Sequence, residues 1–137
     1  MIRINSLEEL SHHMNCHCDL SFTRVENLTF SGTAPPSMAD GTFVGCEFSP
    51  GTAMPENLSG ALFVDCRLVG LRFDRANLFG VQFVRCDLSH TTFHECDLSA
   101  AQFIDCAVGM TRLTHCDLDA ACLPEGHGED KLSVKAA

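Results

Sequence analysis

The feature that most constrains this chain is a repeat of five residues. From Phe43 to Leu123 every fifth residue is apolar, most often leucine or phenylalanine, and a small residue usually lies two positions earlier, as Cys66 does before Leu68. A period of five matches neither the turn of an α-helix nor the alternation of a β-strand. It fits a chain that winds in short straight sides, with two residues of each five pointing inward. The sequence therefore predicts a solenoid.

The units resemble those of the pentapeptide-repeat proteins, which follow the order small, Asp or Asn, Leu or Phe, any, any. The resemblance runs from Gly41 to Glu125, with units such as CDLSH and ANLFG, and a second run with the same period of five covers Cys18 to Gly32. It implies an all-β fold, the right-handed quadrilateral β-helix, in which four units form one square coil. The length available predicts roughly five coils of 20 residues each.

We expect a single domain. Residues 18–125 should form the β-helix, with a loop insertion at 33–40, because that segment contains Pro35 and Pro36 and separates two runs that are offset by three positions. Residues 126–137 are polar and contain glycine, so we expect a flexible C-terminal tail there.

The first residues carry a helical pattern instead of the repeat. Ser6 and Glu9 have the spacing of a capping box at a helix N-terminus. Apolar residues then follow at helical spacing, namely Leu7, Leu10 and Met14. Residues 1–17 are therefore expected as a short helical cap over the first coil, where core side chains and unpaired backbone would otherwise be exposed.

Stacking the sequence at 20 residues per coil places like residues above one another. One face stacks Phe43, Phe63, Phe83 and Phe103, and the opposite face stacks Ala53, Phe73, Phe93 and Leu113. A column of thiols is formed by Cys46, Cys66, Cys86 and Cys106. We interpret these cysteines as small core residues, since a buried free cysteine packs as a small hydrophobe.

The charge of the chain restricts its partners. Eighteen acidic residues against nine Lys plus Arg give a net charge of −9, which disfavours direct binding of nucleic acid and favours a basic partner. No apolar run is long enough to cross a membrane, and the first residues lack the apolar core of a secretory signal, so we expect a cytoplasmic protein with reduced thiols.

No motif indicates catalysis, a cofactor or a metal. The chain lacks the sequence signatures of hydrolases and phosphate-binding loops, and we expect a non-enzyme. The segment from His12 to Cys18 is rich in potential metal ligands, but its spacing fits none of the common zinc motifs, so the prediction is that no metal is bound. A zinc protein built on this segment is kept as the last alternative.

The outward residues of the C-terminal half carry the main functional prediction. They form an acidic surface for partner binding that consists of Asp87, Glu95, Asp97, Asp105, Asp117 and Asp119. Some pentapeptide-repeat proteins are acidic rods that inhibit DNA gyrase by occupying its DNA-binding site. The resemblance thus implies a DNA mimic that inhibits a DNA-binding protein or complex. A CRISPR interference complex, a nuclease and a gyrase-type topoisomerase are the candidate targets, the first of which would make the protein an anti-CRISPR inhibitor.

The alternative function is a protein-binding scaffold or adaptor without DNA mimicry. Outward apolar residues that follow the stacked phenylalanines form a stripe, together with a neighbouring leucine: Val44, Leu62, Val64, Val84 and Ile104. Such a stripe predicts an interface, either for a partner or for a homodimer. A cluster of Arg67, Arg72 and Arg75 could serve a scaffold in the same way.

Overall fold

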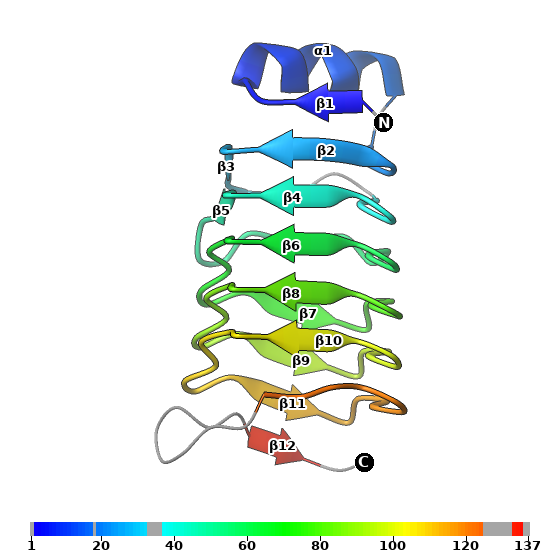
Figure 1. Cartoon of the computed structure of the whole chain (residues 1–137), viewed down its shortest axis with the longest axis vertical. Coiled ribbons are helices and arrows are strands. Elements are labelled where there is room, and N and C mark those ends of the chain that lie inside the picture. Colours follow the sequence, from blue (N-terminus) through cyan, green and yellow to red (C-terminus); the bar gives the residue numbers. More distant parts are fainter. Residues whose placement is uncertain (1, 18, 33–36, 125–132, 136–137) are drawn as a thin grey trace.

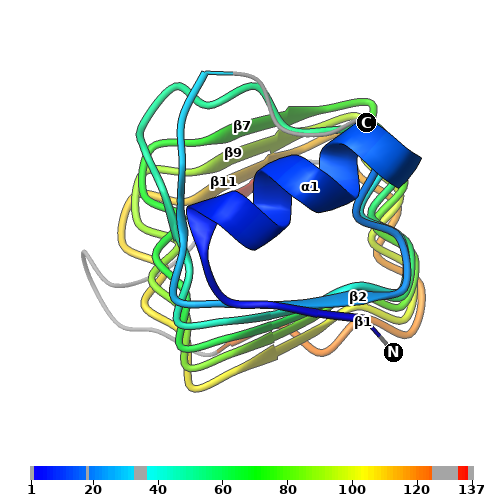
Figure 2. The same cartoon turned by 90° about the horizontal axis from the view of Figure 1, so that it is seen from above.

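The computed structural model covers the whole chain and describes residues 2–17, 19–32, 37–124 and 133–135, with only the backbone of 15–17 and 133–135. Short parallel strands lie one above another and form a rod (Figure 1). Seen along its axis, the rod has a four-sided outline (Figure 2). The predicted β-solenoid is therefore confirmed. None of the described residues forms a helix long and apolar enough to cross a membrane.

The longest sheet has six parallel strands, in the order β1-β2-β4-β6-β8-β10. Their bounds are Ile2–Ile4, Thr23–Glu26, Thr42–Val44, Leu62–Val64, Gln82–Val84 and Gln102–Ile104. From β4 onward each residue pairs with the residue 20 positions later, as Phe63 does with Phe83. The stacking predicted from the sequence is thus the pairing register of this sheet.

The other sides of the rod contain shorter strands. One sheet has the order β12-β11-β9-β7, with the bounds Ser133–Lys135, Arg112–Thr114, Thr92–His94 and Arg72–Asp74. A third side pairs β3, Thr29–Phe30, with β5, Glu47–Phe48, and continues through single bridges at Arg67, Asp87 and Ala107. The fourth side consists of single bridges only, at Ser37, Asn57, Asn77, Asp97 and Asp117.

Backbone hydrogen bonds join each coil to the next. The Gln82 amide donates to the Ala61 carbonyl at 2.9 Å, and the Gln102 amide donates to the Val81 carbonyl at 2.9 Å. Because the strands are only two to four residues long, no coil could be stable alone, and each depends on its neighbours above and below.

The core is a set of stacked side chains, with Phe63, Phe83 and Phe93 fully buried. The ring centroids of Phe63 and Phe83 lie 5.2 Å apart in a stacked arrangement. Phe73 and Phe93 stack at 4.8 Å on the opposite side of the rod, and Phe93 meets Phe83 edge to face at 6.2 Å. The two phenylalanine columns predicted from the sequence therefore meet in one core.

The corners of the rod require left-handed backbone. Most units from Gly45 onward have one residue with a positive φ, and many of these are not glycine, for example Asp65 at 53° and Ala100 at 59°. A Cβ atom makes this conformation costly, whereas glycine adopts it freely. Each non-glycine corner thus carries a conformational cost that the stacked core offsets.

Gly80 and Ala100 occupy equivalent corners one coil apart and provide a matched test of this cost. Gly80 has a φ of 68°, and a Cβ added there would meet no atom within 4 Å. Gly80→Ala should therefore destabilise the fold by about 1 kcal/mol through backbone strain alone. Ala100→Gly should change the unfolding free energy in the opposite direction. Urea unfolding would measure both, and effects of the same sign would contradict the strain argument.

The N-terminal cap has the predicted helix and an additional strand. Helix α1, Leu7–His17, begins after Ser6, whose Oγ accepts a hydrogen bond from the Glu9 amide at 3.1 Å. The Glu9 carboxylate accepts in return from the Asn5 amide at 3.1 Å, one residue earlier than an ideal capping box. Leu10 and Met14 pack against the core. The helix covers the end of the rod in Figure 2.

Two details of the cap differ from the prediction. Leu7 is 64% exposed and does not face the core, because it is the first residue of the helix and lies on its outer side. The preceding residues were expected to belong to the helical cap, but they form β1, which pairs with β2 and buries Ile4 above Val25. The stacked core therefore begins one layer earlier than the repeat.

Part of the predicted loop belongs to the solenoid. Residues 33–36 lie outside the described residues, but Ser37 pairs with Asn57 and Met38 is fully buried. Met38 occupies the place that Leu58 takes in the next coil. The sequence pattern missed this unit because its central residue is Met38, whereas the central residue of most units is leucine or phenylalanine.

The register shifts by one residue on one side of the rod. Ala53 pairs with Arg72, an offset of 19 instead of 20, so Ala53 is exposed and the prediction that it faces the core is wrong. Thr52 and Pro55 are buried instead, and Met54 packs against the core. The coil keeps its 20 residues, because Glu47 pairs with Arg67 and Asn57 pairs with Asn77. One extra residue precedes Ala53 and one fewer follows it, and the standard register returns at Leu58.

At the C-terminal end, β12 pairs in parallel with β11. The flexible tail predicted at 126–137 thus includes one strand that continues a side of the rod. Residues 125–132, 136 and 137 lie outside the described residues.

Candidate protein-binding surface

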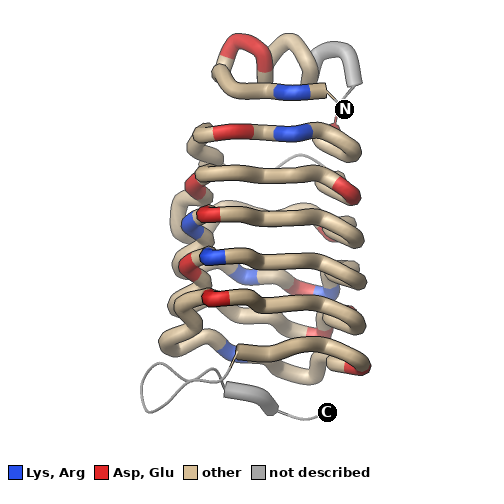
Figure 3. The backbone as a smooth tube through the Cα atoms, in the orientation of Figure 1, with Lys and Arg blue, Asp and Glu red and all other residues tan. Residues whose placement is uncertain are grey.

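Charge is unevenly distributed along the rod (Figure 3). Between Ala61 and Arg85 four arginines outnumber two acidic residues. Between Cys86 and Pro124 six acidic residues accompany one base, Arg112. The C-terminal coils therefore carry a dense negative charge, as the sequence predicted.

The structure brings three of the predicted acidic residues together on the fourth side of the rod. Asp97 pairs with Asp117 in the column that begins at Asn57 and Asn77. Asp119 follows two residues later, and Glu95 lies at the adjoining corner with a half-exposed side chain. We call Asp97, Asp117 and Asp119 the acidic face.

Hydrogen bonds to the backbone orient two of these carboxylates. Asp97 Oδ1 accepts from the Ser99 amide at 3.0 Å, and Asp117 Oδ1 accepts from the Asp119 amide at 3.1 Å. Asn77 makes the same bond with its amide oxygen to the Phe79 amide at 3.1 Å. The fold therefore requires an oxygen at this position, but it does not require a charge.

The other two predicted acidic residues lie elsewhere. Asp87 belongs to the third side, in a column with Arg67, and Asp105 lies at the corner next to that side. Within the described part of the chain, no ion pair engages Asp87, Asp105 or the acidic face. The predicted acidic surface is thus divided between two sides of the rod.

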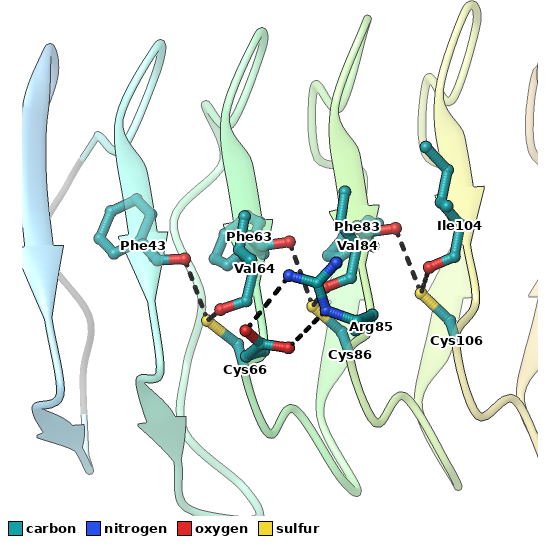
Figure 4. A network of polar contacts seen from close by, with 11 residues as sticks. Phe43, Phe63, Val64, Cys66, Phe83, Val84, Arg85, Cys86, Ile104 and Cys106 are labelled. Carbon is teal, nitrogen blue, oxygen red and sulfur yellow. Dashed lines mark hydrogen bonds and ion pairs between the residues drawn. The ribbon is translucent and has the colours of Figure 1, made fainter.

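The predicted apolar stripe is continuous on the outer surface of the β1–β10 sheet. Val44, Val64, Val84 and Ile104 are aligned by the strand register, and the first three are half-buried while Ile104 is 43% exposed. Leu62 lies on the same strand as Val64 and is also half-buried. Figure 4 shows the side chains of Val64, Val84 and Ile104 in one row.

An ion pair between Asp65 and Arg85 lies beside the stripe and was not predicted from the sequence. Arg85 donates two hydrogen bonds to Asp65, at 2.9 Å and 3.3 Å, and both side chains are more than half exposed. The hydrogen bond from Arg85 lowers the pKa of Asp65 below its ordinary value of 3.8. The two residues occupy the same corner in successive coils, so stacking the sequence at 20 would have found them.

The pair has a testable effect on titration. Arg85→Gln should raise the pKa of Asp65 towards its ordinary value, because the charged hydrogen-bond donor is lost. In the unaltered protein the pair contributes stability above that ordinary value, and the contribution is lost as the pH falls through the lower pKa of the folded state. Carboxyl NMR titration would measure the pKa of Asp65 in the unaltered protein and in the variant. Identical titration curves would mean that the ion pair does not form in solution.

A groove that was not expected on a regular rod lies where the register shifts at Ala53. It has a volume of about 750 Å³ and is lined by Gly51, Thr52, Ala53, Met54, Glu56, Gly70, Arg72, Asp74 and Arg75. Two of the three arginines of the predicted cluster therefore meet there, while Arg67 lies on another side of the rod. Glu56 and Asp74 line the same groove, so their negative charges balance the positive charges of the two arginines.

In the predicted thiol column Cys46, Cys66 and Cys86 are buried, and Cys106 is half-buried. Cys66 Sγ donates to the Phe43 carbonyl at 3.2 Å and Cys86 Sγ donates to the Phe63 carbonyl at 3.2 Å (Figure 4). Hydrogen bonding to its neighbours Cys46 and Cys86, together with burial, raises the pKa of the Cys66 thiol far above its ordinary range. This thiol is therefore a core residue and a poor nucleophile.

The predicted ligand-rich segment is only partly described. His13 is buried and its Nε2 lies 2.9 Å from the Asp19 carbonyl oxygen. The side chains of 15–18 lie outside the described residues. His94 and His115 approach each other, with ring centroids 6.0 Å apart, but the part of the chain that the structure describes holds no cluster of three potential metal ligands.

Comparison with known proteins supports the repeat directly. Residues 57–94 match the model of the Pentapeptide repeats family in eight copies. Among curated protein sequences, none matches this chain.

Solved structures give distant likenesses. Two are trypsin-treated variants of QnrB1, a plasmid-mediated fluoroquinolone resistance protein. One is 18% identical over 74% of this chain and 65% of its own, with a TM-score of 0.46. The other is 16% identical over 77% of this chain and 68% of its own, with a TM-score of 0.46. This chain thus spans about two thirds of their length.

Proposed function

Since the chain is a pentapeptide-repeat protein, we propose that it is a non-enzymatic DNA mimic that binds and inhibits a DNA-binding protein or complex. The observation that carries this proposal is the charge density of the C-terminal coils. The expected site of action is the cytoplasm, where such targets occur.

The density can be compared with that of DNA. Residues 86–124 span about two coils, or roughly 10 Å of the rod at the usual spacing of strands. They carry six acidic residues and one arginine, a net charge of −5. Duplex DNA carries one charge per about 1.7 Å, which is about six charges over the same length. A protein groove that binds duplex DNA would therefore meet a similar negative charge on this rod.

The arrangement of the carboxylates also favours mimicry. Asp97 and Asp117 are held by backbone hydrogen bonds, so these charges have fixed positions, as phosphates on DNA do. They are not neutralised by ion pairs with described residues. Fixed and unpaired carboxylates need little reorganisation before they contact arginine or lysine on a partner.

The identity of the target follows only from the family resemblance. A CRISPR interference complex, a nuclease and a gyrase-type topoisomerase are all proteins whose DNA-binding grooves a short acidic rod could occupy. The proposal is limited to this class of partner.

A scaffold without mimicry is the second candidate, and the outward-facing apolar stripe favours it. Apolar side chains that line up on an outer sheet surface are typical of interfaces. The two functions differ in salt dependence. Binding through carboxylates weakens steeply as salt rises, whereas binding through the stripe does not.

The test is an affinity capture from the native host with the immobilised protein. For a mimic we expect DNA-binding proteins to bind at low salt, to elute at high salt and to be displaced by duplex DNA. Partners that resist both salt and DNA would contradict mimicry and support the scaffold. The control is a second column that carries the variant with Asp97→Asn, Asp117→Asn and Asp119→Asn.

A further inference from the structure

We propose that two copies of this chain form an antiparallel dimer through the outer surface of the β1-β2-β4-β6-β8-β10 sheet. The two-fold axis lies between β6 and β8 and runs parallel to the strands. The proposal is independent of the target, because it involves a different side of the rod from the acidic face.

The apolar stripe provides the contact. Its side chains alternate along each strand with buried phenylalanines, so they point away from the core, as Val64 and Val84 do on either side of the proposed axis. An antiparallel arrangement places the stripe of one copy on the stripe of the other, with Val64 opposite Val84 and Val44 opposite Ile104. In a parallel arrangement the valines and Ile104 would instead face the column of Thr42, Leu62, Gln82 and Gln102, three of whose four residues are polar, so apolar groups would be buried mostly against polar groups. Leu62 faces Gln82 of the other copy in the antiparallel arrangement.

This side of the rod is nearly neutral, unlike the rest of the protein. Its outward strand residues and flanking corners carry the charged side chains Arg3, Arg24, Arg85, Glu26, Asp40, Asp65 and Asp105. Three positive and four negative charges sum to −1, whereas the whole chain carries −9. Two such acidic rods can therefore approach each other through this side with little repulsion.

The position of the axis follows from charge complementarity. Asp65 and Arg85 lie at the same corner of successive coils, one on each side of the proposed axis. The two-fold rotation brings Asp65 of each copy opposite Arg85 of the other. Two ion pairs within the copies and two between them then form a network of four charges. An axis through β6 would instead oppose the two Asp65 side chains.

The opposite flank of the sheet allows close approach. The corners that precede β6, β8 and β10 are Gly60, Gly80 and Ala100, which have little or no side chain. A partner lying on the stripe therefore meets no bulky obstacle there. The sheet has strands of only three or four residues, of which only some point outward, whereas a standard interface has roughly 20–30 residues per partner. We therefore expect a dimer in equilibrium with monomer at micromolar or higher concentrations.

Sedimentation velocity over a concentration series tests the association. The unaltered protein should shift from monomer to dimer as its concentration rises. Val64→Asp should weaken the dimer at least about tenfold, because it buries two carboxylates near the axis. Thr92→Asp adds the same charge on β9, on another side of the rod, and should leave the dimer unchanged. Far-UV circular dichroism would verify that both variants fold.

A charge exchange tests the orientation. Arg85→Asp should weaken the dimer, because each introduced carboxylate would face Asp65 of the other copy. Combining it with Asp65→Arg restores opposite charges both within and between copies, and should restore dimerisation. A parallel dimer would respond little to either change, since Asp65 and Arg85 would then face the small corners at Gly60 and Gly80.

The outcomes separate clearly. A concentration-dependent dimer that Val64→Asp and Arg85→Asp weaken, and that the exchange restores, would support the proposal. A protein that remains monomeric up to about 1 mM, or a dimer that Thr92→Asp disrupts as much as Val64→Asp does, would overturn it. A dimer insensitive to Arg85→Asp would overturn the antiparallel geometry.

Discussion

Phe83→Ala is expected to destabilise the solenoid by about 3–5 kcal/mol. The ring of Phe83 is fully buried and stacks on Phe63 and on Phe103, both at 5.2 Å between centroids. Its removal would leave a cavity in the middle of a continuous column. Because the strands of successive coils pair in parallel and in register, the rings above and below Phe83 cannot move into the cavity without breaking backbone hydrogen bonds.

Phe79→Ala is the matched control for this prediction. Phe79 is 53% exposed and lies four residues from Phe83, so the same chemical change should cost less than about 1 kcal/mol. Denaturant unfolding monitored by circular dichroism would compare the two variants. Equal losses of stability would mean that the assignment of inward and outward residues is wrong.

The second large effect concerns binding. The combination of Asp97→Asn, Asp117→Asn and Asp119→Asn should reduce affinity for the partner at least about tenfold, because it removes three charges from the acidic face. The fold should persist, since the amide oxygen of Asn57 and Asn77 makes the same backbone bond one or two coils away. Titration of the captured partner against each variant, at two salt concentrations, would measure the change.

A control with the same change in net charge distinguishes position from total charge. Glu47→Gln, Glu56→Gln and Asp74→Asn together neutralise three exposed acidic residues that precede the acidic C-terminal coils. Mimicry through the acidic face predicts that this variant keeps most of its affinity. Similar losses in both variants would indicate an unspecific effect of net charge and would contradict a defined binding face.

The regular part of the fold was predictable because every coil repeats one geometry. A residue such as Leu88 has the same neighbours as Leu68, so the five-residue pattern alone places both in the core. The capping helix was predictable for a different reason, since Ser6 and Glu9 act locally on the first turn.

The irregular parts depend on pairing between distant residues. Ile4 is buried because β1 pairs with β2, whose residues come 21 positions later, and no repeat marks the first strand. Its alternation with Ile2 around Arg3 was the available signal. Ala53 is misplaced by the pattern because a local shift of one residue is visible only when the pairing partner, Arg72, is known.

The candidate surface was predictable in part. Stacking at 20 residues brought Asp97 and Asp117 together correctly. It did not show that backbone bonds orient these carboxylates, since those bonds depend on the local geometry of each corner. The role of all these residues in binding remains a prediction.

The pairing of residues 20 positions apart also bears on how such a protein can evolve. Duplication or loss of one whole coil would lengthen or shorten the rod while every side kept its own type of surface. Length and surface chemistry can therefore change independently, which is rare in folds with a single closed core. The coil that contains Ala53 shows that one side can shift its register by one residue while the neighbouring sides keep theirs. A target with a longer or shorter groove could thus be matched by changing the number of coils.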